Sequence, residues 1–320
     1  MHIVTIAALL VAWAGWWRGR TACRGTTLMA AWYWGQAALA MTVLTAGYEF
    51  LEGRSGSLGA GCADHLWYAS CVLWLCPPVS VLGARRPGAA AWGGFVMLPL
   101  VLMLEWPVTG VALAGWISGI KGQLSFEPIR LDWPELVAIL VVLVLGMGNH
   151  LVTRRGWCVV AAAAGIESLL LPLTGWVPDE SVWTTSIRVA GACLIAAAIT
   201  WSRRPHPAWS ESAGRLAHPR SHGLAVAWDD FVQAYGIVWA VRVEARVNED
   251  LKRLNCGASL GPRGVGFEDE AAVSPEEQLQ AIDRAEQTLR WLWRRFVDAS
   301  WIDTRLGLGA PLGAKEPRGL

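Results

Sequence analysis

Residues 134–175 have the sequence PELVAILVVLVLGMGNHLVTRRGWCVVAAAAGIESLLLPLTG. Two apolar runs, each of about 20 residues and long enough to cross the hydrocarbon core of a bilayer as a helix, flank the basic link Thr153–Arg155. Because this link holds two arginines and no acidic residue, it is typical of a cytoplasmic loop between two spans. This stretch alone predicts a helical hairpin through a membrane.

Similar apolar runs recur along the first 201 residues. They cover residues 2–17, 27–48, 65–84, 90–114, 134–152, 156–175 and 183–201. The composition agrees, because 54% of the 320 residues are hydrophobic and only 17% are charged, which excludes an ordinary soluble domain. We therefore expect an all-α fold in which residues 1–201 form a polytopic bundle of seven transmembrane helices.

Charges in the connections predict the orientation. The connections after spans one, three, five and seven hold two or more arginines and no acidic residue, whereas those after spans two, four and six hold most of the acidic residues that precede Trp201. Cytoplasmic loops retain Arg and Lys. We therefore expect a multi-pass protein of a bacterial inner membrane, with its N-terminus outside and its C-terminus in the cytoplasm. A cleaved signal peptide is disfavoured, because only His2 precedes the first apolar run while Arg18 and Arg20 follow it.

Tryptophan supports the same boundaries. The chain holds 21 Trp, and many fall where a span should meet the lipid headgroups, which is the depth that an indole ring favours. We expect anchors at the inner interface at Trp16, Trp17, Trp92, Trp157 and Trp201, and at the outer interface at Trp67, Trp116, Trp133, Trp176 and Trp183.

The chain after Trp201 is water-soluble in character. It holds 16 basic and 16 acidic residues, and this balance argues against a nucleic-acid module, since such modules carry a basic excess. The pattern predicts a linker over residues 202–225, a cytoplasmic hairpin of two helices over 226–301, and a disordered tail over 302–320.

Local signals place the two helices of this hairpin. The first, near residues 229–254, carries an apolar stripe at helical spacing, although alternation over 241–247 leaves a strand open. The second begins at Ser274–Glu277, which has the pattern of a capping box followed by an amphipathic run. Between them, residues 257–266 hold four glycines and are expected to form a flexible loop.

Among the ionisable residues inside predicted spans, three are the best functional candidates, because a charge within the membrane is costly. Glu105 in span four and Glu167 in span six lie at similar depths, about 14 to 16 Å below the outer boundary. The long side chain of Arg188 in span seven can reach toward Glu167. We predict an intramembrane polar site of Glu105, Glu167 and Arg188, with one carboxylate left to carry a proton or bind a cation. The alternative is that a Glu167–Arg188 pair only pins two helices together.

A second candidate site lies at the outer face, between spans two and three. It comprises Glu49, Glu52, Asp64 and His65. A histidine beside a carboxylate can exchange protons near neutral pH. The alternative is a set of solvated loop residues without shared chemistry.

One residue of the soluble hairpin departs from its pattern. Trp291 projects to the polar side of the second helix, near Arg295, instead of joining the apolar face. An exposed Trp beside Arg suits a membrane surface or a protein partner. We predict a surface contact at Trp291 and Arg295, and the alternative is that Trp291 packs on the linker.

No cofactor, metal site or catalytic residue is predicted. A haem held by two histidines is disfavoured, because His65 and His150 lie at opposite ends of their spans, about 30 Å apart. The spans contain no Lys for a retinal Schiff base, and the chain lacks the H-E-x-x-H, G-x-S-x-G and P-loop motifs.

The sequence therefore favours a non-enzymatic membrane protein: an accessory, sensor-like or assembly component. Its expected partners are the lipid bilayer and a protein bound through the cytoplasmic hairpin, and no nucleic acid. The main alternative is a transporter or proton-coupled carrier that uses the intramembrane Glu/Arg site. A third hypothesis is a lipid-modifying enzyme that uses the outer acids with His65.

Overall fold

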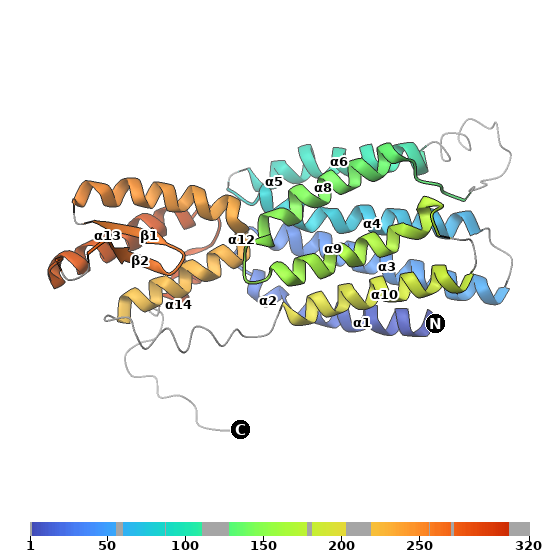
Figure 1. Cartoon of the computed structure of the whole chain (residues 1–320), viewed down its shortest axis with the longest axis horizontal. Coiled ribbons are helices and arrows are strands. Elements are labelled where there is room, and N and C mark those ends of the chain that lie inside the picture. The colour runs from blue at the N-terminus through green and yellow to red at the C-terminus, as the bar shows by residue number, and fades with distance from the viewer. Residues whose placement is uncertain are drawn as a thin grey trace, which may run out of the picture. The chain divides into compact units, whose positions relative to one another are not determined.

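The computed structural model describes residues 2–55, 60–86, 88–110, 128–177, 181–202, 219–255, 257–269 and 272–306 (Figure 1). The chain forms two compact units. The first unit comprises Met1–Arg24, Leu28–Ala84 and Gly88–Arg204. The second comprises Gly25–Thr27, Arg85–Pro87 and Pro205–Leu320, so two short segments from the N-terminal half belong to it.

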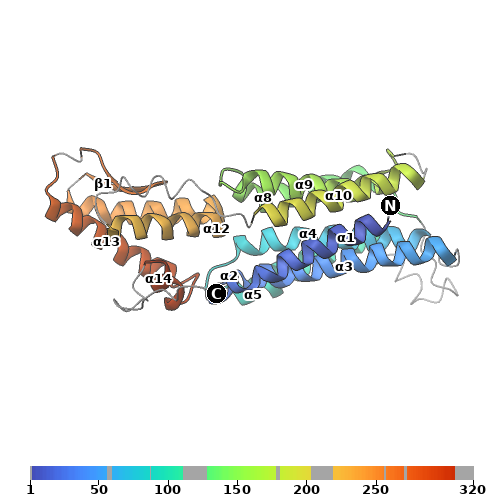
Figure 2. The same ribbon diagram turned by 90° about the horizontal axis from the view of Figure 1, so that it is seen from below.

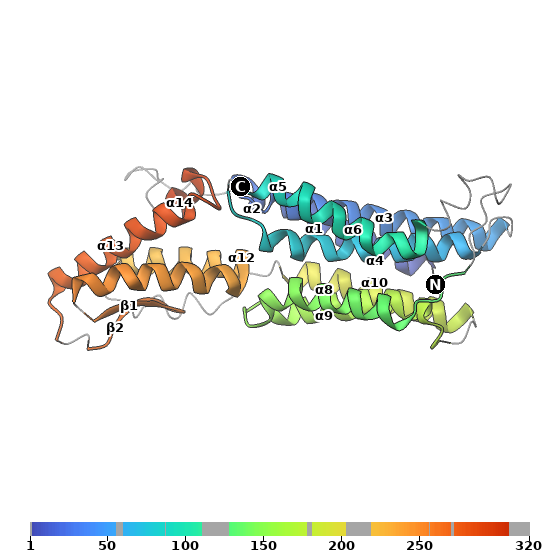
Figure 3. The ribbon, with the colours of Figure 1, turned by 90° about the horizontal axis from the view of Figure 1, so that it is seen from above.

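All secondary-structure elements described in the first unit are helical. Its elements are α1 (His2–Arg18), α2 (Arg20–Cys23), α3 (Met29–Ser55), α4 (Ala60–Leu82), α5 (Ala89–Trp92), η1 (Gly93–Met97), α6 (Leu98–Glu105), η2 (Trp106–Gly110), α8 (Trp133–Leu151), α9 (Gly156–Leu170), η3 (Leu171–Thr174) and α10 (Ser181–Trp201). Figures 2 and 3 both show α8, α9 and α10 in one layer and α1, α3 and α4 in the other. The layers join where α1 packs on α10 and α4 packs on α8 and α9.

Within its described residues, five helical stretches of this unit are long and apolar enough to cross a membrane. They are Gly61–Leu82, Gly93–Gly110, Trp133–Leu151, Gly156–Thr174 and Val182–Trp201. The other two predicted spans are also helical, as α1 and α3. However, α1 is short at 17 residues, and α3 includes Tyr33, Gln36 and Tyr48. The structure therefore supports a helical membrane protein, with five helices that meet the length and composition of a span.

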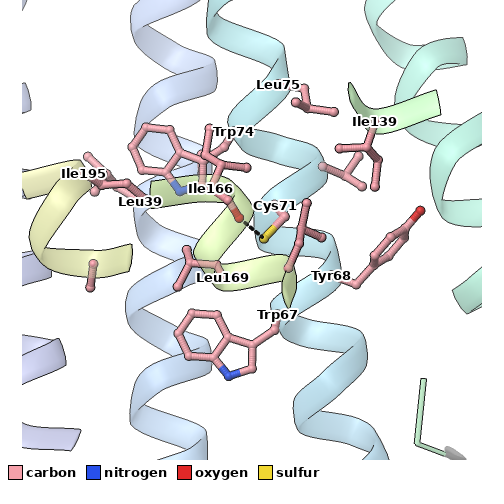
Figure 4. Packing of buried hydrophobic residues seen from close by; sticks show 14 of the residues in the cluster. Leu39, Trp67, Tyr68, Cys71, Trp74, Leu75, Ile139, Ile166, Leu169 and Ile195 are labelled. Atoms are coloured by element: carbon pink, nitrogen blue, oxygen red, sulfur yellow. Dashed lines mark hydrogen bonds between the residues drawn. The ribbon is translucent and has the colours of Figure 1, made fainter. Parts of the chain in front are cut away.

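A large apolar core cluster joins the helices of the first unit (Figure 4). The thiol of Cys71 on α4 points to the carbonyl oxygen of Ile166 on α9, with 3.9 Å between sulfur and oxygen. Helices α9 and α10 approach closely at Gly165 and Gly191, where an added Cβ at Gly165 would lie 2.9 Å from the Gly191 carbonyl oxygen. Glycine at these positions permits the close contact of two backbones.

The exposure of the rings agrees with the prediction of interface anchors at most described positions. It contradicts that prediction at Trp67. Six of the predicted anchors have exposed rings, as an anchor requires: Trp17, Trp133, Trp157, Trp176, Trp183 and Trp201. Trp67 is fully buried in the core instead (Figure 4). Its place near the end of a span gives its depth but not the side of the helix that it faces. Trp116 lies outside the described residues.

The second unit mixes helices with a small sheet. Its elements are α12 (Pro219–Leu251), η5 (Lys252–Leu254), β1 (Ala258–Gly261), β2 (Gly264–Phe267), α13 (Pro275–Trp293) and α14 (Ala299–Arg305). Strands β1 and β2 pair antiparallel, with Leu260 opposite Val265. Phe231 lies at the centre of the aromatic core, where its ring packs against Trp293 and Phe296.

Helix α12 consists of two segments, 219–235 and 237–251, which meet at Gly236 (Figure 1). The backbone of Gly236 has φ 78° and ψ −178°, a conformation that only glycine adopts readily. The β-hairpin contacts both segments: Gly264 lies against Ala225, and the Asn248 amide exchanges two hydrogen bonds with Leu260. The chain therefore turns back at Gly236.

Four local predictions for the C-terminal segment are wrong. Residues 257–266 were expected to be a flexible loop, but they form most of the β-hairpin, because the glycines permit its turn and the Asn248 amide fixes its register. The predicted linker over 202–225 is helical from Pro219, and the predicted tail over 302–320 is helical to Arg305. The first predicted helix contains the turn at Gly236, so a description of this segment as two helices omits a helical segment.

Other predictions for this segment are confirmed. Residues 241–247 are helical and not a strand. The capping box is present, because Ser274 Oγ accepts from the Glu277 N–H and the Glu277 carboxylate accepts from the Ser274 N–H. The apolar face of α13 is buried at Ala281, Ile282, Ala285, Leu289 and Trp293, while Leu279 is exposed because it lies in the first turns of the helix.

The two short segments are held in the second unit by backbone hydrogen bonds. The Thr27 N–H donates to the Phe296 carbonyl oxygen over 2.8 Å, and the Asp298 N–H donates to the Gly25 carbonyl oxygen over 2.7 Å. The Arg86 N–H donates to the Arg295 carbonyl oxygen over 2.7 Å. The Arg86 guanidinium also binds the Asp298 carboxylate, with 2.8 Å between nitrogen and oxygen.

Candidate functional site

Among the described residues of the first unit, the Arg188 guanidinium on α10 is a buried charged group. The side chain is only 6% exposed. Its Nη1 binds the Glu49 carboxylate of α3, and its Nη2 lies 3.2 Å from Asp64 Oδ1 on α4. One arginine therefore connects three helices through ion pairs with two carboxylates.

Two further groups complete this Arg188 cluster. The guanidinium carbon lies 5.1 Å from the centre of the buried Trp67 ring, a favourable cation–π distance. His2 Nδ1 on α1 lies 3.7 Å from Glu49 Oε2. The cluster thus takes side chains from α1, α3, α4 and α10.

The predicted ion pair between Glu167 and Arg188 is wrong. The Arg188 guanidinium binds Glu49 and Asp64 instead, and the buried Glu167 Oε1 has no hydrogen-bond partner among the described residues. The depth of a residue in a span does not fix which way its side chain points around the helix. Glu167 and Arg188 lie on helices that pack together, but Arg188 faces α3 and α4.

Glu105 belongs to a second polar row. The Thr109 hydroxyl donates to Glu105 Oε2 over 3.0 Å, and the same hydroxyl lies 3.4 Å from His65 Nδ1. Glu105 ends α6, and Thr109 lies in the π-helical segment η2 that continues it. Single π segments often occur at functional positions.

In the first unit, the structure therefore groups the predicted residues into two sites that differ from the predicted ones. Arg188 from the intramembrane site joins Glu49 and Asp64 from the outer-face site. His65 from the outer-face site joins Glu105 through Thr109. Glu52 lies one helical turn after Glu49 on α3.

This arrangement has a definite chemical capacity. The Arg188 cluster fixes one positive charge between two negative charges, and such a set of ion pairs holds helices in one arrangement. In the row of His65, Thr109 and Glu105, the imidazole and the carboxyl group can exchange protons, and the Thr109 hydroxyl lies between them. Within the described residues, no group of three His, Cys, Asp or Glu side chains could hold a metal ion.

The second unit presents a different polar surface. Both oxygens of the Asp250 carboxylate accept from Arg284, over 2.7 and 2.8 Å, and Thr288 donates to it over 2.6 Å. These hydrogen bonds from Arg284 and Thr288 hold the pKa of Asp250 below its usual value. A shallow groove of about 260 Å³ lies beside this carboxylate, and Arg246, Arg253 and Trp291 line it.

The exposed Trp291 and the partly buried Arg295 form a pair at the end of α13. The Trp291 ring is 52% exposed, and the Arg295 guanidinium lies 5.0 Å from its centre. The alternative, that Trp291 packs on the linker, concerns residues of which 203–218 lie outside the described part of the chain.

Four residues of these arrangements were missed as site residues from the sequence. Thr109 lies four residues after Glu105, a spacing that brings side chains together on a helix and gave a usable signal. Trp67 was assigned to the interface by its position. Asp250 and its partner Arg284 lie 34 residues apart, and no local pattern connects them.

Comparisons with models of protein families, with curated proteins and with solved structures found no match.

Proposed function

We propose that this chain is a non-enzymatic, sensor-like accessory protein of a bacterial inner membrane. It crosses the bilayer seven times, with the N-terminus outside and the second unit in the cytoplasm. The Arg188 cluster lies toward the outer side, and the second unit responds to changes at that cluster.

One observation carries this proposal: the two helices that supply the carboxylates of the cluster also lead into the second unit. Helix α3 carries Glu49 near its end and begins two residues after Thr27, which bonds to Phe296. Helix α4 carries Asp64 near its start and ends four residues before Arg86, which bonds to Arg295. A change in the ion pairs can therefore shift both helices and act on the second unit.

The orientation is supported by the same residues. Residues 25–27 and 85–87 follow spans one and three, and they share a compact unit with the chain after span seven. All three then lie on one side of the membrane. Because these connections are the arginine-rich ones, that side is the cytoplasm.

Hydrogen exchange on the full chain in lipid nanodiscs tests the proposal. Asp64→Asn removes one carboxylate charge from the cluster, and we expect amide exchange at residues 25–27 and 296–298 to rise several-fold. Glu167→Gln is the matched control, because it changes a carboxylate on α9 that has no ion pair with Arg188 in the structure. Equal exchange in the wild-type, Asp64→Asn and Glu167→Gln proteins would contradict the sensor proposal.

The row of His65, Thr109 and Glu105 supports a second candidate function, a proton-coupled carrier. Such a carrier would move protons into liposomes that contain a pH-sensitive dye, and Glu105→Gln would stop this flux. The sensor proposal predicts no flux above that of protein-free liposomes. A flux that depends on Glu105 would therefore favour the carrier.

A further inference from the structure

A basic and aromatic surface lies at the C-terminal end of α13. Residues 85–86 and 291–298 together hold four arginines and one aspartate. Arg85 and Arg294 are exposed, and Arg295 covers one face of the half-exposed Trp291 ring. The single acid, Asp298, is already bound to Arg86. We name this surface, formed by Arg85, Trp291, Arg294 and Arg295, the basic patch.

The length of the chain keeps the basic patch close to the end of a span. Arg295 is hydrogen-bonded to Arg86, which follows Leu82, the last residue of α4, by four residues. Four residues reach at most about 14 Å when fully extended. Trp291 lies one helical turn from Arg295, about 6 Å along the axis. If α4 spans the membrane, the patch is thus within reach of the headgroup layer, which is about 5 to 7 Å thick on each side.

We propose that the basic patch binds the anionic phospholipid headgroups of the cytoplasmic leaflet. Arginine forms paired hydrogen bonds with phosphate oxygens, and a Trp ring is stable at the headgroup level. The cytoplasmic leaflet is the negatively charged one, so the charges of patch and partner are complementary. This inference rests on the proposed orientation, and it adds a ligand class for the second unit.

The test uses the full chain, labelled with 5-fluorotryptophan, in nanodiscs that contain a lipid with a nitroxide on its headgroup. The fluorine signal that disappears in Trp291→Phe belongs to Trp291. The signal that disappears in Trp228→Phe gives a reference, because Trp228 is buried in the second unit. One set of discs contains phosphatidylcholine only, and the other contains phosphatidylcholine and phosphatidylglycerol in equal amounts.

We expect the nitroxide to broaden the Trp291 signal strongly in the discs with phosphatidylglycerol and weakly in the others. The doubly substituted Arg294→Gln, Arg295→Gln protein should lose this difference, because each arginine near an anionic surface contributes about fivefold to binding. An unchanged Trp228 signal shows that this variant is folded.

Two outcomes would overturn the proposal. Equal broadening in both discs would mean that the patch lies near the membrane without recognising anionic lipid. A sharp Trp291 signal in both kinds of disc would mean that the ring does not contact the headgroups, and would favour a protein partner instead. The proposed orientation fails separately, if a protease added outside intact spheroplasts cleaves the second unit.

Discussion

Asp250, Arg284 and Thr288 form a cluster in the second unit, here called the Asp250 cluster. It contains the same kinds of charged groups as the Arg188 cluster, in different surroundings. In the first unit, the guanidinium of Arg188 is 6% exposed and lies between two carboxylates. In the second unit, the guanidinium of Arg284 is 46% exposed and binds one carboxylate. Water screens the Arg284 guanidinium but hardly reaches the Arg188 guanidinium, so the removal of one charge should have different costs in the two units.

Arg188→Leu should have the largest effect. The substitution leaves Glu49 and Asp64 facing each other without a positive charge, and loss of one member of a buried ion pair costs about 3 to 5 kcal/mol. Equilibrium unfolding of the full chain in mixed detergent micelles measures this loss.

The control for Arg188→Leu also removes the charges of the two carboxylates that lose their partner. A protein with Arg188→Leu, Glu49→Gln and Asp64→Asn should recover a large part of the lost stability, since it has no unpaired carboxylate at the cluster. A loss below about 1 kcal/mol in the single variant would show that solvent reaches the cluster as it reaches an exposed ion pair.

Asp250→Asn should cost about 1 kcal/mol or less, because water screens the partly exposed pair with Arg284. The substitution removes the charge that accepts hydrogen bonds from Arg284 and Thr288. Thermal unfolding of the second unit, followed through its fluorine-labelled tryptophans, gives the difference. Glu249→Gln is the control, because its pair with Arg246 is exposed on both sides and should contribute less. A loss as large as that of Arg188→Leu would remove the contrast between the two clusters.

The stability of the second unit should also depend on pH through Asp250. Its pKa is lowered in the folded state, chiefly by the hydrogen bond from Arg284, whereas an unfolded chain has an Asp pKa of about 3.9. The unfolded state therefore binds a proton first as the pH falls. The contribution of Asp250 is complete above about pH 4 and declines as the pH falls through the lower, folded value.

Unfolding measured between neutral pH and about pH 3 checks this dependence. The wild-type protein should lose stability faster than Asp250→Asn over the acid end of the range, by a fraction of 1 kcal/mol. Parallel curves for the two proteins would show that Asp250 has the same proton affinity in both states.

The two units also differ in how much of their structure follows from the sequence. Apolar runs and charged connections predicted the helical stretches of the first unit, because span length and loop charge depend on local composition. In the second unit, the capping box at Ser274 was predictable for the same reason. The turn at Gly236 was not, since a single glycine inside a helical pattern gives no sign of its backbone angles.

The sequence predicted which residues belong to the candidate sites, but it did not predict which of them bind each other. Arg188, Glu49, Asp64, Glu105 and His65 were all singled out from the sequence as charged or titratable groups in or near spans. Their division into the Arg188 cluster and the row through Thr109 depends on the rotation of each helix about its axis. Tertiary packing sets that rotation, for example the close approach of α9 and α10 at Gly165 and Gly191.

The smallest expected effect is the coupling between Glu167 and Arg188. The structure directs the Arg188 guanidinium to Glu49 and Asp64, and Glu167 Oε1 is buried without a hydrogen-bond partner in the described part of the chain. A double-mutant cycle with Arg188→Leu and Glu167→Leu should therefore give an interaction free energy below about 0.5 kcal/mol. Arg188→Leu with Asp64→Leu is the matched cycle and should give a larger value. Because an ion pair between Glu167 and Arg188 would reverse this order, the two cycles together decide which carboxylates balance the buried arginine.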